Sequence, residues 1–265
     1  MRLKIDHKTR YNFEHPVSFG LQQLRKTPKS STQQTVLAWD TSVVNGCKEL
    51  EFEDHHRNKV ELISFTSGTT QLEISCAGEI ELTDTNGVVG AHLGPSPLWL
   101  YKRQTDQTRA RARSRALLRD HNISADLDGM HRLSKVITQK VKYSLGVSKT
   151  DWTAEDVLEA GQGVCQDHAH VFLACAREVG VPARYVSGYL MLTDRTVQDA
   201  MHAWVEAYFS NIGWVGFDVS NSISPDTRYV RVATGLDYMD ASPVTGIRVG
   251  GEGENLDVRI DVSQQ

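Results

Sequence analysis

A cysteine at the start of a predicted helix is the residue of this sequence best suited to chemistry. Residues 161–170 read GQGVCQDHAH, and the segment that begins at Cys165 repeats apolar residues at the spacing of one buried helix face. The glycines before it leave the backbone free to turn. Unpaired N–H groups and the positive end of the helix dipole favour a thiolate over a thiol there. Cys165 is therefore a candidate nucleophile.

A cysteine in an apolar stretch is usually a small buried hydrophobic residue, and we interpret Cys175 in this way. Two later stretches of the sequence favour a catalytic role for Cys165 instead. They read MHAWVEAYF and GWVGFD, and they contain His202 and Asp218. A thiol that attacks a carbonyl carbon must pass its proton to a base, and histidine is the usual one. The histidine needs an acceptor that holds its tautomer and stabilises its charged form. His202 and Asp218 can supply these two roles.

Strand geometry tests whether these two residues can meet. Both stretches alternate in polarity, and a turn centred on Asn211 predicts a hairpin. In that register Asp218 lies opposite Trp204 and one diagonal step from His202, on the same face and about 7–8 Å away at the backbone. A register shifted by one residue would place the two side chains on opposite faces.

The negative oxygen of a tetrahedral intermediate also needs hydrogen-bond donors. The backbone N–H of Cys165 is one candidate. For a second donor the sequence leaves three alternatives, which are Gln162, Tyr143 and Trp152.

Several neighbours offer competing roles. His168 and His170 could act as the base, but on a helix they point away from a side chain at the N-terminal tip. Asp167 lies in the first turn, where a structural cap is the favoured interpretation. Asn221 is a weak substitute for Asp218 in orienting the histidine.

Other polar and aromatic residues could have either a structural or a functional role. Glu206 shares a strand face with His202 and could bind an amine or tune the base, although a solvated or rim carboxylate is at least as good an interpretation. Trp204 and Trp214 could line a cleft, but alternate aromatics on a strand more often belong to the core. We interpret the pair His55 and His56 as part of a solvated turn.

Metal binding is not expected. The histidine pair lacks a further ligand at a helpful spacing, and a group made from Cys165, Asp167, His168 and His170 matches no zinc pattern.

The elements that must position these residues change in type along the chain. Residues 2–83 alternate in the manner of strands, residues 84–100 form a connection, and helices are predicted at 108–121 and 128–143 and from Thr153. After Pro182 strands return, and the tail is predicted to form a terminal hairpin. We therefore expect an α+β fold, with an N-terminal β domain at 1–90 and a catalytic domain at 91–265 that includes the hairpin.

Composition narrows the functional classes. The 265 residues are 40% hydrophobic and carry a net charge of −4, which argues against a nucleic-acid-binding protein. The sequence has no signal-like segment and no run of 18 apolar residues, so no membrane association is expected. The four cysteines show no CxxC spacing, which favours free thiols and a cytoplasmic location. The oligomeric state is left open.

Four motifs in order resemble the bacterial transglutaminase-like cysteine-enzyme family. They are GVCQDHAH at 163–170, GVPARYVSGYL at 180–190, HAWVEAY at 202–208 and GWVGFD at 213–218. The opening, with Tyr11, Phe13 and Pro16-Val17, is similar to that family's N-terminal β domain, and the tail GLDY at 235–238 also fits. One departure is His168, where the family leads us to expect an aromatic residue.

The resemblance implies a papain-like transglutaminase core with Cys165, His202 and Asp218 as the catalytic triad. It implies cleavage or transfer at an amide or peptide bond through a thioacyl intermediate, without a cofactor. We favour hydrolysis of a peptide or amide substrate, because water is abundant and no amine site is evident. Transamidation of protein glutamine is one alternative, acyl transfer to a small amine is another, and a non-catalytic binding protein is a third.

Overall fold

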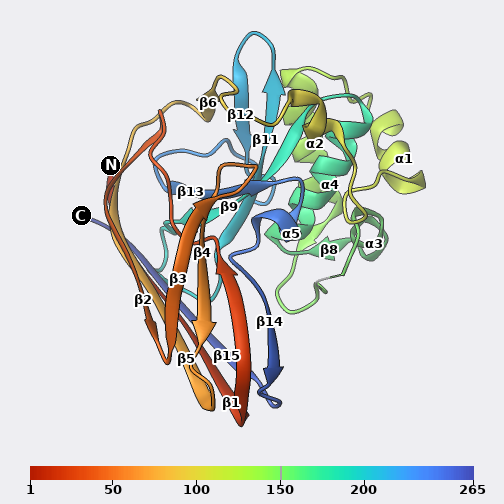
Figure 1. The fold of residues 1–265 in the computed structure, drawn as a ribbon. Coiled ribbons are helices and arrows are strands. Elements are labelled where there is room, and N and C mark those ends of the chain that lie inside the picture. Colours follow the sequence, from red (N-terminus) through yellow and green to blue (C-terminus); the bar gives the residue numbers. More distant parts are fainter. Residues whose placement is uncertain (150) are drawn as a thin grey trace.

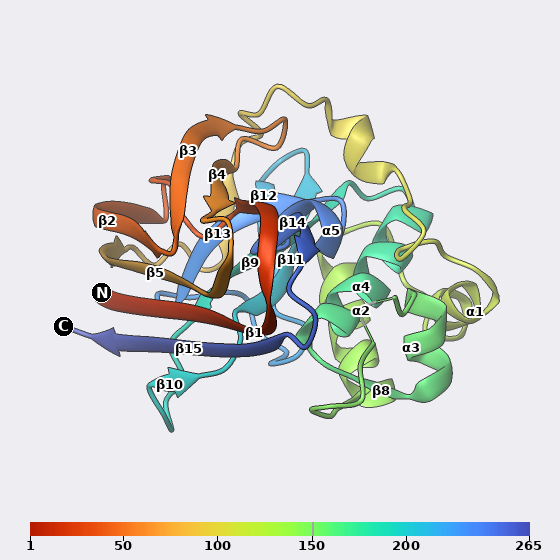
Figure 2. The same ribbon diagram turned by 60° about the horizontal axis from the view of Figure 1, so that its bottom comes forward.

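Two antiparallel sheets and a group of helices make up the fold. The computed structural model describes residues 1–149 and 151–265, and it confirms the predicted α+β class (Figure 1). We call the larger sheet the N-terminal sheet and the smaller one the core sheet. The core sheet lies between the N-terminal sheet and the helices (Figure 2).

The N-terminal sheet is built from the predicted β region together with the end of the chain. Its strands are β1 (Arg2–Leu24), β2 (Gln34–Val44), β3 (Gly46–Glu53), β4 (Lys59–Phe65), β5 (Thr69–Leu82), β10 (Val197–Gln198), β14 (Val244–Gly250) and β15 (Asn255–Gln264). Burial alternates along the first half of β1, where Leu3, Ile5 and Tyr11 point inward. This is the period of two that a strand with one buried face requires.

The predicted C-terminal hairpin is wrong. β14 pairs with the second half of β1, and β15 pairs with the first half, so both strands belong to the N-terminal sheet. The short strand β6 (Val88–Gly90) pairs instead with the core sheet. A hydrophobic pattern predicts that a segment forms a strand, but it does not predict which strand that segment pairs with. The pairing depends on which sheet edges are available in the folded protein. The division of the chain at residue 90 stays a prediction.

The core sheet has the order β13-β9-β11-β12-β6. Its longer strands are β9 (Ala183–Leu190), β11 (His202–Phe209), β12 (Gly213–Phe217) and β13 (Tyr229–Gly235). The helical elements are η1 (Leu98–Lys102), α1 (Ala112–Asp120), α2 (Leu127–Lys140), α3 (Ala154–Ala160), α4 (Cys165–Glu178) and α5 (Tyr238–Ala241). A small parallel ladder joins β7 (Lys142–Tyr143) to β8 (Gln162–Gly163).

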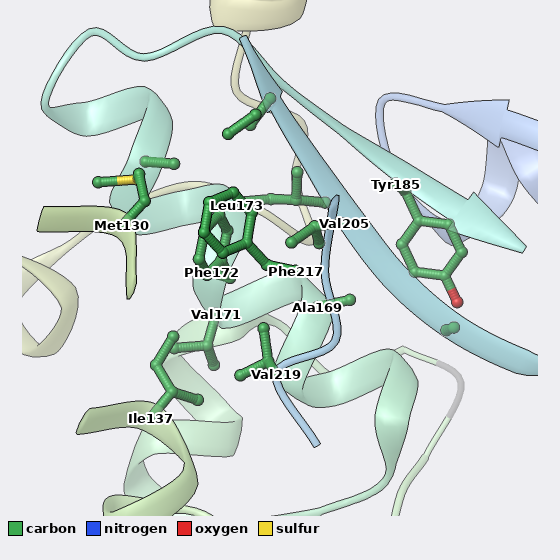
Figure 3. Packing of buried hydrophobic residues seen from close by; sticks show 14 of the residues in the cluster. Met130, Ile137, Ala169, Val171, Phe172, Leu173, Tyr185, Val205, Phe217 and Val219 are labelled. Carbon is green, nitrogen blue, oxygen red and sulfur yellow. The ribbon is translucent and has the colours of Figure 1, made fainter. Parts of the chain in front are cut away.

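Helix α4 is the central element of the hydrophobic core. Val171, Phe172 and Leu173 are fully buried, and the ring of Phe172 lies 5.3 Å from that of Phe217 on β12 (Figure 3). Phe217 directly precedes Asp218 in the chain. The contact between these two rings therefore helps to set the position of the cysteine-bearing helix relative to the segment that carries the aspartate.

Candidate active site

Cys165 is the first residue of α4, as predicted, and its side chain is partly exposed. The backbone N–H of Val164 donates to Asp167 Oδ2 at 2.7 Å, so Asp167 caps the helix from within its first turn. A Cβ added at Gly163 would lie 2.7 Å from Cβ of Asp167. Glycine at this position is therefore what allows the chain to pass close to the cap.

His202 begins β11, and the predicted hairpin register is confirmed. Tyr208 pairs with Trp214 and Val205 pairs with Phe217. β12 ends at Phe217, and Asp218 follows in an isolated bridge with Ile223. On its other side β11 pairs with β9, where His202 lies opposite Gly188, so β11 is an interior strand of the core sheet.

His202 and Asp218 are in direct contact. His202 Nε2 donates to Asp218 Oδ2 at 2.6 Å, the His202 side chain is 11% exposed, and Asp218 is fully buried. Two further donors reach the same carboxylate oxygen, Asn221 Nδ2 at 2.7 Å and the Tyr229 hydroxyl at 2.7 Å. Asn221 thus supports Asp218 rather than replacing it. Tyr229 was not predicted, because β13 carries it and no nearby spacing links it to the motif.

Electrostatics keep this pair charged. Burial opposes the charged forms of both groups, but their mutual attraction and hydrogen bond outweigh it. The pKa of His202 rises to about 10, and the pKa of Asp218 is lowered with help from Tyr229 and Asn221. At neutral pH the site therefore holds a protonated imidazole beside a carboxylate.

Cys165 completes the group. A hydrogen bond and charge interaction with Cys165 also contribute to the raised pKa of His202. Because Nε2 of His202 is bound to Asp218, Nδ1 is the ring nitrogen left for the sulfur. The structure therefore brings together the three residues that the sequence singled out, with the imidazole between the thiol and the carboxylate.

His168 has a structural role that explains the departure from the expected aromatic residue. Its Nε2 donates to the backbone carbonyl of Val141 at 2.9 Å, and its Nδ1 lies 2.8 Å from Ser220 Oγ. Since Nε2 carries the proton, Nδ1 accepts from the serine hydroxyl. Burial lowers the pKa of His168, which keeps it neutral. It ties the end of α2 to the loop that follows Asp218.

His170 is fully buried, away from solvent. Its Nε2 accepts from the backbone N–H of Tyr238 at 3.2 Å, and burial lowers its pKa to about 3. Both ring nitrogens of His168 are engaged, and His170 lies in the core. Neither histidine is therefore placed to serve Cys165.

The interpretation of Glu206 as a solvated carboxylate is wrong. Glu206 is fully buried and bound by two guanidinium groups, with Arg184 Nε at 2.5 Å and Arg231 Nε at 2.8 Å. Arg184 also stacks 3.9 Å above the ring of Trp214. Trp204 and Trp214 are both buried, as the core interpretation predicted. The charge of Glu206 is compensated by β9 and β13, partners that no local pattern reveals.

Two of the predicted oxyanion donors, Tyr143 and Gln162, lie in the ladder of β7 and β8 next to the start of α4. The ladder of β7 and β8 pairs Tyr143 with Gly163, two residues before Cys165. Burial and the charges of Cys165 and Asp218 raise the pKa of Tyr143 to about 12, so its hydroxyl keeps its proton. A second donor to the oxyanion stays a prediction.

The structure also corrects the solvated-turn interpretation of residues 54–58. His55 is exposed, but the side chain of His56 is fully buried, and its Nε2 lies 3.3 Å from Asp240 Oδ2. Within residues 1–149 and 151–265, His55, His56 and Asp240 form the one group of metal-ligating side chains close enough to share an ion. The alternative metal group around Cys165 does not assemble in that part of the chain.

Family models match the two regions of the chain separately. Residues 115–219 match the transglutaminase-like superfamily, and residues 3–81 match the bacterial transglutaminase-like N-terminal region. The chain thus carries a transglutaminase-like core behind a bacterial transglutaminase-like N-terminal region. These two matches confirm the resemblance, and the match of the core supports cysteine-dependent chemistry at amide bonds in the broad sense.

Two similar proteins match this chain over nearly its whole length, and a third matches part of it. An uncharacterised protein of Mycobacterium leprae is 26% identical over 280 residues, which cover 99% of each chain. Another from Mycobacterium tuberculosis is 37% identical over 131 residues, 45% of this chain and 42% of that protein. The crystal structure of a candidate cysteine protease from Cytophaga hutchinsonii superposes with a TM-score of 0.80 over 99% of this chain and 90% of its own, at 19% identity. This likeness shows a shared fold.

Among residues 1–149 and 151–265, no helix is both long and apolar enough to cross a bilayer.

Proposed function

We propose that this protein is a cysteine peptidase or amidase that uses Cys165, His202 and Asp218. The observation that carries the proposal is the 2.6 Å contact between His202 and the fully buried Asp218, beside a cysteine at a helix N-terminus. A buried carboxylate fixes the imidazole in one orientation, with its second nitrogen toward the thiol. The match of the core to the transglutaminase-like superfamily supports the same kind of chemistry.

The reaction follows from these positions. The thiol proton resides on His202, and the sulfur of Cys165 attacks the carbonyl carbon of an amide, forming a C–S bond. The backbone N–H of Cys165 stabilises the negative oxygen of the tetrahedral intermediate. When the C–N bond breaks, His202 donates its proton to the leaving amine. His202 then takes a proton from water, whose oxygen attacks the carbonyl carbon of the thioester. The C–S bond breaks, His202 returns the proton to the sulfur, and the carboxylic acid is released.

Water is the favoured acyl acceptor in this proposal. A transamidase needs a place for the incoming amine, and the carboxylate that the sequence offered for it was Glu206. That carboxylate is occupied by Arg184 and Arg231, and it is fully buried. Transamidation remains the alternative, and product analysis with and without an added primary amine separates the two. We further propose that the reaction needs no cofactor, since the thiol supplies the nucleophile and the imidazole transfers the proton. We also propose a cytoplasmic location.

The test is the rate of thiol alkylation across pH, resolved for each cysteine by mass spectrometry. Cys47 is exposed and serves as an internal reference for an ordinary thiol, whereas Cys76 and Cys175 are buried. Iodoacetamide should label Cys165 faster than Cys47 at neutral pH, because a protonated His202 stabilises the thiolate. In His202→Ala this advantage should disappear while labelling of Cys47 is unchanged.

The alternative class, a binding protein that keeps the fold without turnover, predicts a different result. Cys165 would then label no faster than Cys47, and His202→Ala would have no effect. That outcome would overturn the proposed activity for the free protein.

A further inference from the structure

The turn between β3 and β4 faces helix α5 across the contact between the N-terminal sheet and the core. We propose that His55, His56 and Asp240 bind a divalent transition-metal ion of the zinc class, and that the ion clamps this turn to the core. Two imidazoles and one carboxylate are the ligand types that such ions prefer. The proposal is independent of the proposed peptidase activity.

The three side chains converge although the sequence separates them. His56 lies 184 residues before Asp240, and each of the three residues offers a ligand atom within 4.8 Å of the others. The His56 side chain is fully buried, the Asp240 side chain is 34% exposed, and His55 is exposed. An ion held here would be shielded on the His56 side and open to water on the His55 side.

The buried imidazole of His56 is poorly satisfied by the protein alone. Its Nδ1 has no hydrogen-bond partner among the described residues, and its Nε2 has one long contact of 3.3 Å to Asp240. Nearby His92 is different, because Trp214 Nε1 donates to its Nδ1 and its Nε2 donates to the carbonyl of Ser96. An ion bound at Nε2 would replace this long contact with a short coordinate bond, so the weak pairing of Nε2 with Asp240 is the observation that favours an ion. The ion would not satisfy Nδ1, which needs a partner of its own.

The distances suit a tetrahedral ion. Two ligands bound at about 2.0–2.1 Å on such an ion lie about 3.3 Å apart, which is the separation of His56 Nε2 and Asp240 Oδ2. Only the side chain of His55 would have to move to reach the ion, and its ring centre is 4.1 Å from that of His56. Because His55 is exposed, its side chain can rotate toward the ion at little cost in packing.

The backbone around the group is held in place before any ion binds. Asp54 Oδ1 accepts from the N–H groups of His56 and Asn58, both at 2.9 Å. The Asn58 side chain exchanges two hydrogen bonds with the backbone of Thr234 on β13, at 2.7 and 2.8 Å. This docks the turn on the strand that leads into α5. Preorganised ligands of this kind lower the entropic cost of binding an ion.

Charged groups near the site act in both directions. The Asp240 carboxylate accepts from the backbone N–H of Leu236 at 2.9 Å, which holds it in place beside His56. One buried cation, Arg177, acts against an added ion. Arg177 interacts with both Asp237 and Asp240, and its guanidinium is bound to the carbonyl of Leu236. The two carboxylates outnumber that guanidinium.

The experiment is a Zn²⁺ titration of the full chain carrying Cys165→Ala, which removes the thiol as a competing ligand. Binding is followed by competition with a chromophoric chelator and by the melting temperature. We expect one ion per chain and a higher melting temperature, because the ion binds only the folded protein. His55→Gln, Asp240→Asn and His56→Gln should each weaken binding by about tenfold or more.

The exposed His55→Gln variant keeps the test decisive if loss of the buried His56 impairs folding. The matched control is His15→Gln, which removes an exposed histidine outside the group and should bind as the parent does. Visible absorption of bound Co²⁺, of the intensity of a four-coordinate ion, would further support the site. Equal Zn²⁺ affinity in His55→Gln, Asp240→Asn and His15→Gln, or no binding in the parent, would overturn the proposal.

Discussion

A single carboxylate oxygen organises the candidate active site at the scale of residues. Asp218 Oδ2 accepts from His202, Asn221 and Tyr229, and the aspartate is fully buried. Three donors compensate a charge that burial would otherwise make costly. The orientation of His202 therefore depends on residues that do not touch the reacting atoms.

Tyr229→Phe tests this dependence. Removing the hydroxyl takes away one of the hydrogen bonds that lower the pKa of Asp218, so the carboxylate should hold His202 less firmly. We expect kcat to fall by about tenfold with little change in KM, and the acid limb of the pH profile to move to higher pH. Tyr208→Phe, on β11 beside Trp214, is the control. Equal effects of the two substitutions on kcat and on the acid limb would refute the positioning role.

The protonation of His202 also links the site to stability. Its folded-state pKa of about 10 lies above its ordinary value of 6.5, so the stabilisation from the charged imidazole is fully present below pH 6.5. It is lost as the pH rises through about 10. The difference in unfolding free energy between the wild type and His202→Gln should therefore shrink over this interval.

Urea denaturation at about pH 6 and about pH 10 measures that difference. The exposed His15→Gln serves as the control, because its effect should not follow this titration. A constant difference between wild type and His202→Gln at the two pH values would contradict the raised pKa.

At the scale of elements, the start of α4 depends on a cap and a glycine. Asp167 closes the first turn on the N–H of Val164, and Gly163 leaves the space that this cap requires. The same turn holds Cys165 and the backbone N–H that we assign to the oxyanion. The cap therefore contributes both to helix stability and to the geometry of the proposed reaction.

Gly163→Ala should lower the stability of α4 and disturb the geometry around Cys165. The added methyl group would lie 2.7 Å from Cβ and Oδ2 of Asp167, so the cap or the backbone must move. We expect a loss of about 1–3 kcal/mol in the free energy of unfolding and a lower rate of Cys165 alkylation. Gly94→Ala is the control, since its nearest contact would be an ordinary 3.4 Å. Unchanged alkylation of Cys165 in Gly163→Ala would show that the helix start tolerates the shift.

At the scale of the whole molecule, the N-terminal sheet and the core share one hydrophobic cluster. Leu3, Ile80 and Val262 of the sheet are buried in the same cluster as Phe172 of α4. Hydrogen bonds cross the same contact, from Gln34 to the backbone of Arg231 and from Asn58 to Thr234. The N-terminal sheet is therefore part of the support of the site.

Asn58→Ala probes that support. It leaves both the N–H and the carbonyl of Thr234 without their side-chain partner in a buried position. We expect a loss of about 2–5 kcal/mol in the free energy of unfolding, measured by urea denaturation. The exposed Asn255→Ala should have little effect. A loss in Asn58→Ala no larger than in Asn255→Ala would show that the sheet contributes little through this contact.

The sequence by itself determined most of the elements and the residues that we propose as the reactive ones. The apolar spacing after Cys165 predicted α4, and the alternation around His202 and Asp218 predicted the register that the structure confirms. These features follow from local periodicity, because side-chain direction in a helix or strand depends on nearby backbone geometry. The proposed triad came from the chemistry of three residue types, and the order of short motifs implied the same residues.

Only the tertiary structure decided which distant groups meet. Tyr229 reaches Asp218, Arg184 and Arg231 enclose Glu206, Asp240 approaches His56, and β14 and β15 join β1 rather than each other. Each of these contacts joins segments with no fixed spacing between them. These contacts depend on how whole elements pack and on the need to compensate buried charge. A local hydrophobic pattern predicts neither of these.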